Sequence, residues 1–226
     1  MGRDAKAARR GADGGRRVMH WSAIANYLAV NWLENVAAVI TLVGIWLTTR
    51  RTLICWPIVL ISDILYLVVF YRENLKSDAF LQVFFIAFTL YSWWNWARGV
   101  RLQGEVRVVP MRLTGWLGGL IVGALGSILV GWWMARIGAA LPHLDATLAV
   151  FSLVASWWEA RKHTANWWLW IVVDAVYVGE YLYKDMWTTA MLYAGFVALA
   201  VLGLRSWQLA LSQASEARPG APSVTD

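Results

Sequence analysis

The chain has 226 residues, 20 Lys and Arg against 14 Asp and Glu, a formal charge of +6, and 59% hydrophobic residues. Only 15% of the residues are charged, against about a quarter in soluble domains, so the composition excludes a soluble globular protein, a disordered chain and a coiled coil. The single cysteine, Cys55, excludes a disulfide framework and is too few for a zinc or iron–sulfur site.

Residues 1–32 are predicted to precede the first repeat, and their first part, 1–17, is polar, glycine-rich and basic, which predicts a solvated tail. An apolar lead-in over 18–33 follows, and we expect it at the membrane interface. Met19 is an alternative start of the protein.

Seven apolar stretches follow, separated by short charged segments, and most have the roughly 17 to 25 residues that a helix needs to cross a bilayer. The predicted spans are 33–49, 53–71, 79–97, 113–134, 145–158, 167–183 and 186–204. The fifth is short when it is judged alone.

An internal repeat supports the fifth span. An offset of 111 residues superposes 34–96 on 145–207 without a gap. Uncommon residues coincide, among them the pairs Trp46 and Trp157, Trp56 and Trp167, Asp63 and Asp174, Tyr66 and Tyr177, and Trp96 and Trp207. Such matches indicate duplication of a three-helix unit.

The predicted fold is therefore an all-α integral membrane protein. Its seven transmembrane helices form two parallel three-helix repeats, 33–97 and 145–207, joined by one linker helix within 98–144 (3+1+3). Residues 208–226 are predicted to be a disordered tail. The linker helix carries Gly115, Gly119 and Gly123 at four-residue spacing, which favours close helix packing, equally within one protomer or between protomers of a homo-oligomer.

Lys and Arg in short loops predict the orientation, because cytoplasmic loops carry the excess of both. If successive connections lie on alternate faces of the membrane, one face carries most of the Lys and Arg: Arg50, Arg51, Arg98, Arg101, Arg107, Arg112, Arg161, Lys162, Arg205 and Arg218. Arg72, Lys76, Arg136 and Lys184 fall on the other face. We expect a cytoplasmic C-terminus and an external N-terminus, although the basic N-terminal tail opposes this orientation.

Two intramembrane acids are the main candidates for function. Asp63 and Asp174 each lie on a predicted helix face with aromatic residues, and a carboxylate at mid-membrane needs a partner, water or a ligand. Such a face suits a flat cation, which is attracted to both rings and carboxylates. The alternative is that each Asp only bonds a neighbouring helix. The aromatic candidates are Trp56, Trp167, Trp170 and Tyr177, with Trp46 as a further stacking surface.

The third and seventh predicted helices add polar candidates. Gln82 and Thr89 share one face of 79–97, and Tyr193 occupies the position equivalent to Gln82. An interhelical hydrogen bond explains Gln82 equally well. Glu180, four residues before Lys184, is interpreted as a structural ion pair. The familiar hydrolase, phosphoryl-transfer and dinucleotide motifs are absent, so we expect no enzyme, no cofactor, no metal and no nucleic-acid partner.

Several motifs together resemble the PnuC family of vitamin transporters. They are Cys55-Trp56-Pro57, LISDILYLVVFY, FLQVFF and YSWWNW in the first half, and NWWLWIVVD, YLYK and LGLRSW in the second. The resemblance implies a fold similar to the SWEET proteins and facilitated diffusion of nicotinamide riboside across the bacterial cytoplasmic membrane for NAD salvage. It also implies a cytoplasmic vitamin kinase that traps the solute. Gln82, Trp170 and Asp174 would line the site.

This sequence departs from the family pattern at Thr89, where an Asn is common, and at Asp174, where Asn also occurs. Relatives that carry thiamine or riboflavin therefore remain alternatives. Nicotinamide riboside and thiamine are permanent cations and suit Asp63 and Asp174 better than neutral riboflavin does. A membrane scaffold that binds no solute is the alternative from another functional class.

Overall fold

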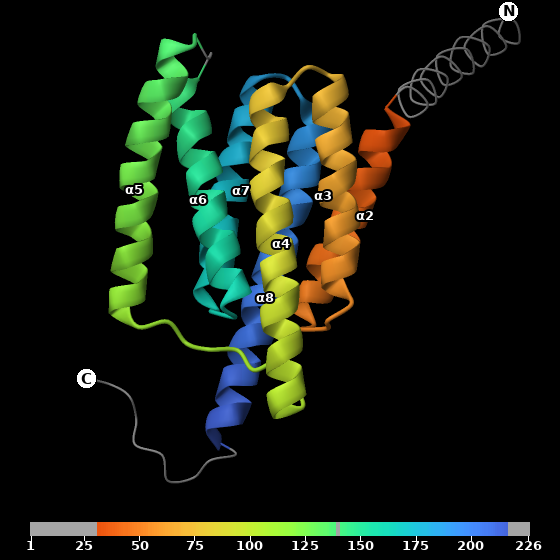
Figure 1. Cartoon of the computed structure of the whole chain (residues 1–226), viewed down its shortest axis with the longest axis vertical. Helices are drawn as coiled ribbons and strands as arrows, with labels where there is room; N and C mark the ends of the chain where they lie inside the picture. The colour runs from red at the N-terminus through yellow and green to blue at the C-terminus, as the bar shows by residue number, and fades with distance from the viewer. Residues whose placement is uncertain (1–30, 139–140, 217–226) are drawn as a thin grey trace, which may run out of the picture.

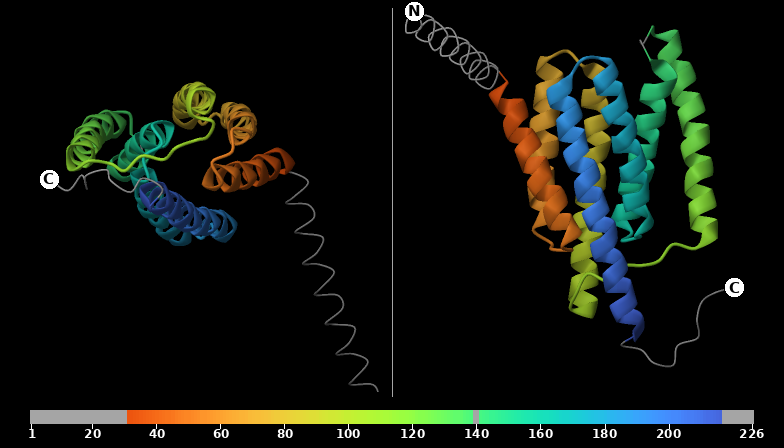
Figure 2. Two further views of the ribbon diagram at one scale, coloured as in Figure 1. Left: turned by 90° about the horizontal axis from the view of Figure 1, so that it is seen from below. Right: turned by 180° about the vertical axis from the view of Figure 1, so that it is seen from behind.

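The computed structural model describes residues 31–138 and 141–216. Seven helices make up this part of the chain, and Figures 1 and 2 show them packed side by side along a common direction. They are α2 (Trp32–Thr49), α3 (Cys55–Arg72), α4 (Lys76–Gln103), α5 (Leu113–Arg136), α6 (Pro142–Ala160), α7 (Ala165–Tyr183) and α8 (Trp187–Glu216). The prediction of an all-α protein with seven helices is confirmed for these residues.

The helix ends differ most from the prediction in α4 and α8. Both continue past the apolar stretch, and α8 makes residues 208–216 helical where a tail was predicted. Ala, Gln and Glu in this segment are good helix formers, and Ala210 is still buried. α6 begins earlier than predicted because Pro142 suits the first turn of a helix. The predicted lead-in and the rest of the C-terminal tail lie almost entirely outside the described residues.

Four of these helices, α2, α3, α5 and α8, are long and apolar enough to cross a membrane by length and composition. The other three fall short of that level. α7 contains Trp, Tyr and two acids, and these residues lower its average hydropathy. Candidate site residues lie on both kinds of helix: Gln82 and Asp174 belong to the less apolar α4 and α7, and Asp63 belongs to the apolar α3.

Helix packing follows the chain order with two additions. α2, α3 and α4 pack in sequence, as do α5, α6, α7 and α8. Contacts of α2 with α8 and of α4 with α6 join the two groups. The view along the helix axes in Figure 2 shows α5 at the edge of the bundle, next to α6.

Turn conformations recur at the offset of the sequence repeat. Arg51 and Lys162 both have positive φ, at 59° and 64°, and so do Asn74 and Asp185, at 59° and 56°. Positive φ is uncommon for residues other than Gly. Each pair is separated by 111 residues, so the repeat is visible in the backbone as well as in the sequence.

Hydrogen bonds across the two helix crossings recur in the same way. Side chains near the end of α4 donate to the last carbonyls of α6, and those of α8 donate to the last carbonyls of α2. The bonds are Asn95 Nδ2 to Ala160 O (2.8 Å), Trp96 Nε1 to Glu159 O (3.3 Å), Ser206 Oγ to Thr49 O (2.9 Å) and Trp207 Nε1 to Thr48 O (3.3 Å). The bonds to Ala160 O and Thr49 O satisfy carbonyls at a helix end, where the helix itself offers no donor. Glu159 O and Thr48 O also accept the backbone N–H groups of Lys162 and Arg51.

A tryptophan cluster of Trp56, Trp96, Trp167 and Trp207 fills the space between the crossings. Trp56 meets Trp96 edge to face at 4.9 Å between ring centroids, and Trp167 meets Trp207 in the same way at 5.4 Å. Trp96 and Trp207 then join the two pairs at 5.7 Å. The cluster is the main hydrophobic core of the described chain.

The segment between α4 and α5 crosses one end of the bundle (Figure 2). The Val109 N–H donates to Lys162 O at 2.9 Å, and the Thr164 N–H donates to Val109 O at 3.3 Å. Lys162 Nζ donates to Asn95 O at 3.2 Å, and burial lowers the pKa of this ammonium group below its ordinary value. The segment is thereby held against the turn between α6 and α7, and the side chain of Lys162 joins this turn to α4.

The glycine stripe of α5 packs within the protomer. A Cβ added at Gly123 would lie 2.5 Å from Phe151 Cε1, and one at Gly119 would overlap the ring of Trp158. Both aromatic residues belong to α6. The close approach of these two helices therefore requires glycine at these positions.

Gly123→Leu is expected to destabilise the protein by about 1–3 kcal/mol, because the added side chain must displace Phe151. Thermal unfolding of detergent-purified protein measures the change. Gly118→Leu is the matched control, since nothing lies within 4 Å of a Cβ added there. Equal melting temperatures for the two variants would contradict the packing role.

Candidate functional site

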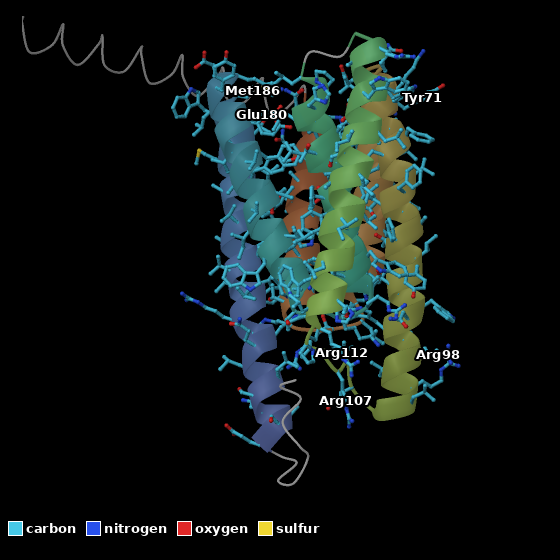
Figure 3. The ribbon with its side chains drawn as sticks, turned by 90° about the vertical axis from the view of Figure 1, so that its left-hand side faces the viewer. Tyr71, Arg98, Arg107, Arg112, Glu180 and Met186 are labelled. Carbon is cyan, nitrogen blue, oxygen red and sulfur yellow. The ribbon has the colours of Figure 1, made fainter. Side chains whose placement is uncertain are left out.

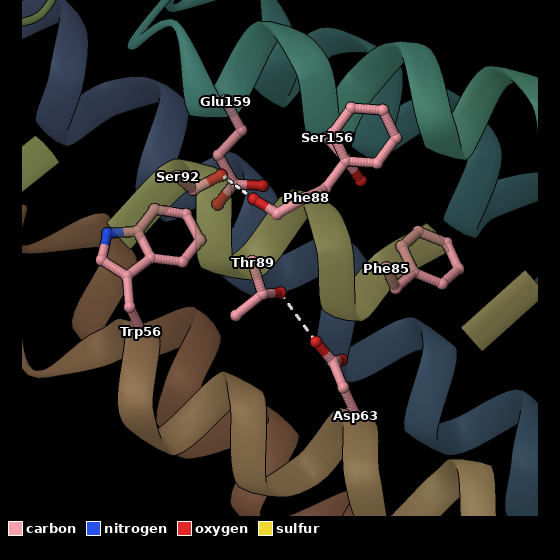
Figure 4. Close-up of a pocket in the computed structure, with 8 residues that line it drawn as sticks. All are labelled: Trp56, Asp63, Phe85, Phe88, Thr89, Ser92, Ser156 and Glu159. Carbon is pink, nitrogen blue, oxygen red and sulfur yellow. Dashed lines mark hydrogen bonds between the residues drawn. The ribbon is translucent and has the colours of Figure 1, made fainter. Parts of the chain in front are cut away.

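A small cavity of about 50 Å³ lies between α3, α4 and α6. Its lining combines aromatic rings, hydroxyl groups and two carboxylates (Figure 4). The lining residues are Trp56, Asp63, Phe85, Phe88, Thr89, Ser92, Ser156 and Glu159. The cavity thus receives side chains from both halves of the sequence repeat.

Asp63 is held by two neighbours on α4. Gln82 Nε2 donates to Asp63 Oδ1 at 3.2 Å, and Thr89 Oγ1 donates to Asp63 Oδ2 at 2.7 Å. Gln82 and Thr89 are both buried. Hydrogen bonds of this kind offset part of the cost of keeping a carboxylate out of water. The structure therefore joins three predicted site residues in one group.

Glu159 faces Asp63 from the α6 side of the cavity (Figure 4). Its Oε2 accepts a hydrogen bond from Trp170 Nε1 at 3.3 Å. Trp170 is thereby linked to the cavity lining through Glu159. Sequence analysis missed Glu159 because the predicted span ended at residue 158, and because the repeat aligns it with Thr48 rather than with another acid.

Two predicted stacking residues belong chiefly to the core. Trp56 lines the cavity and also packs on Trp96. Trp167 is buried against Trp207 and against the backbone of Gly203. Trp56 therefore both lines the cavity and packs in the core, whereas Trp167 packs in the core.

Trp46 belongs neither to the cavity lining nor to the tryptophan cluster. It is 42% exposed, and the Arg50 guanidinium lies 4.4 Å from its ring centroid. Its repeat equivalent Trp157 is also exposed and carries Arg161 over its ring at 5.4 Å. Such Trp–Arg pairs are typical of residues at a membrane interface. The structure does not bring Trp46 to the cavity.

The remaining predicted residues form a second group around α7 and α8. The ring of Tyr193 lies 4.7 Å from that of Tyr177 and 5.2 Å from that of Tyr181, measured between centroids. Asp174 is buried and lies within electrostatic reach of Tyr177 and Tyr193. It has no hydrogen bond to another side chain in the part of the chain described here.

The geometry suits recognition of a polar or positively charged aromatic solute. Carboxylates and rings converge, and among the residues that the structure describes neither Lys nor Arg lines the cavity. Within residues 31–138 and 141–216, no three His, Cys, Asp or Glu side chains gather as a metal site. The arrangement offers hydrogen-bond acceptors, negative charge and stacking surfaces.

Comparison with known proteins gives concordant matches. A family model described as nicotinamide mononucleotide transporter matches residues 31–209. The riboflavin/roseoflavin transporter RibM of Streptomyces davaonensis is 29% identical over 187 residues, which cover 79% of this chain and 85% of RibM. The nicotinamide riboside transporter PnuC of Escherichia coli is 23% identical over 204 residues, with the same two coverages.

A solved structure shares the fold. The crystal structure of a vitamin B3 transporter PnuC superposes with a TM-score of 0.68 at 22% identity. The match covers 87% of this chain and 90% of that one. The observed helical architecture is therefore also found in a transporter.

Proposed function

Because the chain belongs to the nicotinamide mononucleotide transporter family, we propose that it carries nicotinamide riboside into the cell by facilitated diffusion. The protein is a multi-pass vitamin transporter of a bacterial membrane. Phosphorylation by a cytoplasmic kinase then traps the vitamin, and the solute enters NAD salvage. Transport of this kind is not catalysis and requires no cofactor.

One observation carries the choice of a cationic vitamin. Asp63 presents a hydrogen-bonded carboxylate to an aromatic cavity that, in the described part of the chain, no Lys or Arg lines. The positive ring of nicotinamide riboside is attracted to both features. Thiamine, another permanent cation, fits the same argument. Riboflavin is the second candidate, because RibM, the relative with 29% identity, is named for it.

The proposed architecture is two parallel three-helix repeats, α2–α4 and α6–α8, joined by α5. The paired crossings and the matched turns at Arg51 and Lys162 support it. A cavity of about 50 Å³ has room for one or two water molecules, so a riboside requires α3, α4 and α6 to separate. Rocking of one repeat against the other about the crossings would provide that space.

The proposed orientation places the C-terminus in the cytoplasm and the N-terminus outside. Figure 3 shows Arg98, Arg107 and Arg112 at one end of the bundle, and Tyr71, Glu180 and Met186 at the other. An excess of Arg is typical of the cytoplasmic end. The protein would therefore lie in the inner membrane with the segment between α4 and α5 facing the cytoplasm.

Purified protein is expected to bind nicotinamide riboside saturably, and its reconstitution into liposomes should permit uptake without ATP or an imposed ion gradient. Calorimetric titration with riboside, thiamine and riboflavin measures the preference. Asp174→Asn and Trp170→Ala should each weaken riboside binding by about tenfold, the worth of one lost polar contact. Unchanged affinity in both variants would contradict these site assignments. No binding of any of the three vitamins would favour a scaffold.

A further inference from the structure

We propose that Glu159 is a specificity-determining residue, whose carboxylate selects a flat heteroaromatic cation over a neutral vitamin. The inference rests on the proposed transport function and extends it to the choice of solute. It starts from the placement of Glu159 opposite Asp63 across the cavity (Figure 4).

The position of Glu159 is fixed at two atoms. Its backbone carbonyl accepts the Trp96 indole N–H at 3.3 Å, which anchors the last turn of α6. Its Oε2 accepts the Trp170 indole N–H at 3.3 Å, which directs the side chain. These two bonds direct the carboxylate of Glu159 toward the cavity.

Nearby basic groups are engaged elsewhere. The Arg161 guanidinium lies over the ring of Trp157, and Lys162 Nζ donates to Asn95 O. The ion pairs in the part of the chain described are Arg107 with Glu105 and Lys184 with Glu180, and neither lines the cavity. Glu159 and Asp63 therefore share one cavity that no Lys or Arg of the described residues lines.

Two acids that face one cavity without a counter-ion favour a positively charged occupant. A cation placed between them interacts with both carboxylates, and with the Trp and Phe rings of the lining. A neutral vitamin leaves both charges without compensation after water is displaced. Glu159 thus discriminates by charge, whereas the aromatic rings accept any flat ring system.

The asymmetry of the repeat supports a role beyond the fold. The position equivalent to Glu159 is Thr48, whose backbone carbonyl makes the matching bond to Trp207. Since the crossing forms there without an acid, the carboxyl group of Glu159 is not required to build it. What the acid adds at this position is charge toward the cavity and a hydrogen bond to Trp170.

The test compares vitamin preference in E159Q and E159D. Glutamine keeps the length of the side chain and an oxygen acceptor for Trp170 but removes the charge, whereas aspartate keeps the charge. We expect E159Q to bind nicotinamide riboside and thiamine about tenfold more weakly with riboflavin affinity unchanged or higher. E159D should retain the cation preference. E105Q, at an exposed acid of the segment between α4 and α5, is the control.

Three outcomes would overturn the inference. They are an unchanged preference in E159Q, equal losses for charged and neutral vitamins, and the same loss of preference in E159D as in E159Q. The wild-type titration keeps the two proposals apart. If wild-type protein binds none of the vitamins, the proposed function fails; if it binds them and E159Q binds them alike, only the role of Glu159 fails.

Discussion

Asp63→Asn is expected to lower the affinity for nicotinamide riboside by about 100-fold, the equivalent of roughly 2.7 kcal/mol. The substitution removes the negative charge that attracts the solute. It also turns one acceptor into an amide donor that faces Gln82 or Thr89, both of which donate to Asp63 in the structure. Hydrogen bonds to a charged group contribute about 1.5–3 kcal/mol each, so disturbing one is enough for the expected loss.

Calorimetric titration of purified protein measures this effect, and Asp78→Asn is the matched control. Asp78 lies in the first turn of α4 and does not line the cavity. The Asp78→Asn variant should bind riboside with the affinity of the wild-type protein. A loss below threefold in Asp63→Asn would show that the cavity carboxylate does not recognise the solute. An equal loss in the two variants would indicate a general electrostatic effect instead.

Much of the fold could be predicted from the sequence because bilayer length and gene duplication both leave strong patterns. The 111-residue offset identified a helix at 145–158 that hydropathy alone supported weakly, and α6 occupies this region. Helix ends were harder to predict. α4 and α8 extend into polar sequence, where helix formation depends on capping and on packing against neighbouring segments rather than on apolar residues.

The group of Asp63, Gln82 and Thr89 could be predicted in part, because helix periodicity places residues on a common face. Gln82 and Thr89 are seven residues apart and share a helix face, so a single acid on the neighbouring helix can reach both. Glu159 could not be found in this way. Glu159 reaches the cavity only because α6 packs against α4, a contact that joins the two groups of helices. The sequence repeat aligns Glu159 with Thr48, which is not an acid, so the repeat does not single out this position.

The repeat also suggested roles that the structure assigns to packing. Trp46 matches Trp157 because both lie near helix ends with an Arg over the ring. Trp56 matches Trp167 because each packs edge to face against a tryptophan of the third helix of its repeat, Trp96 or Trp207. Identity between repeats thus records a shared structural position. Residues that differ between the repeats, such as Glu159 and Thr48, are where the two halves can divide binding between them.

Trp207→Ala is expected to destabilise the protein by about 3 kcal/mol, because Trp207 is fully buried at the centre of the tryptophan cluster. Alanine leaves a cavity beside Trp96 and Trp167, and it removes the donor to Thr48 O. The melting temperature should fall by roughly 10 °C. Trp168→Ala, at an exposed position of α7, should melt close to wild type. If both variants melt alike, the crossing of α8 with α2 does not hold the two halves of the transporter together.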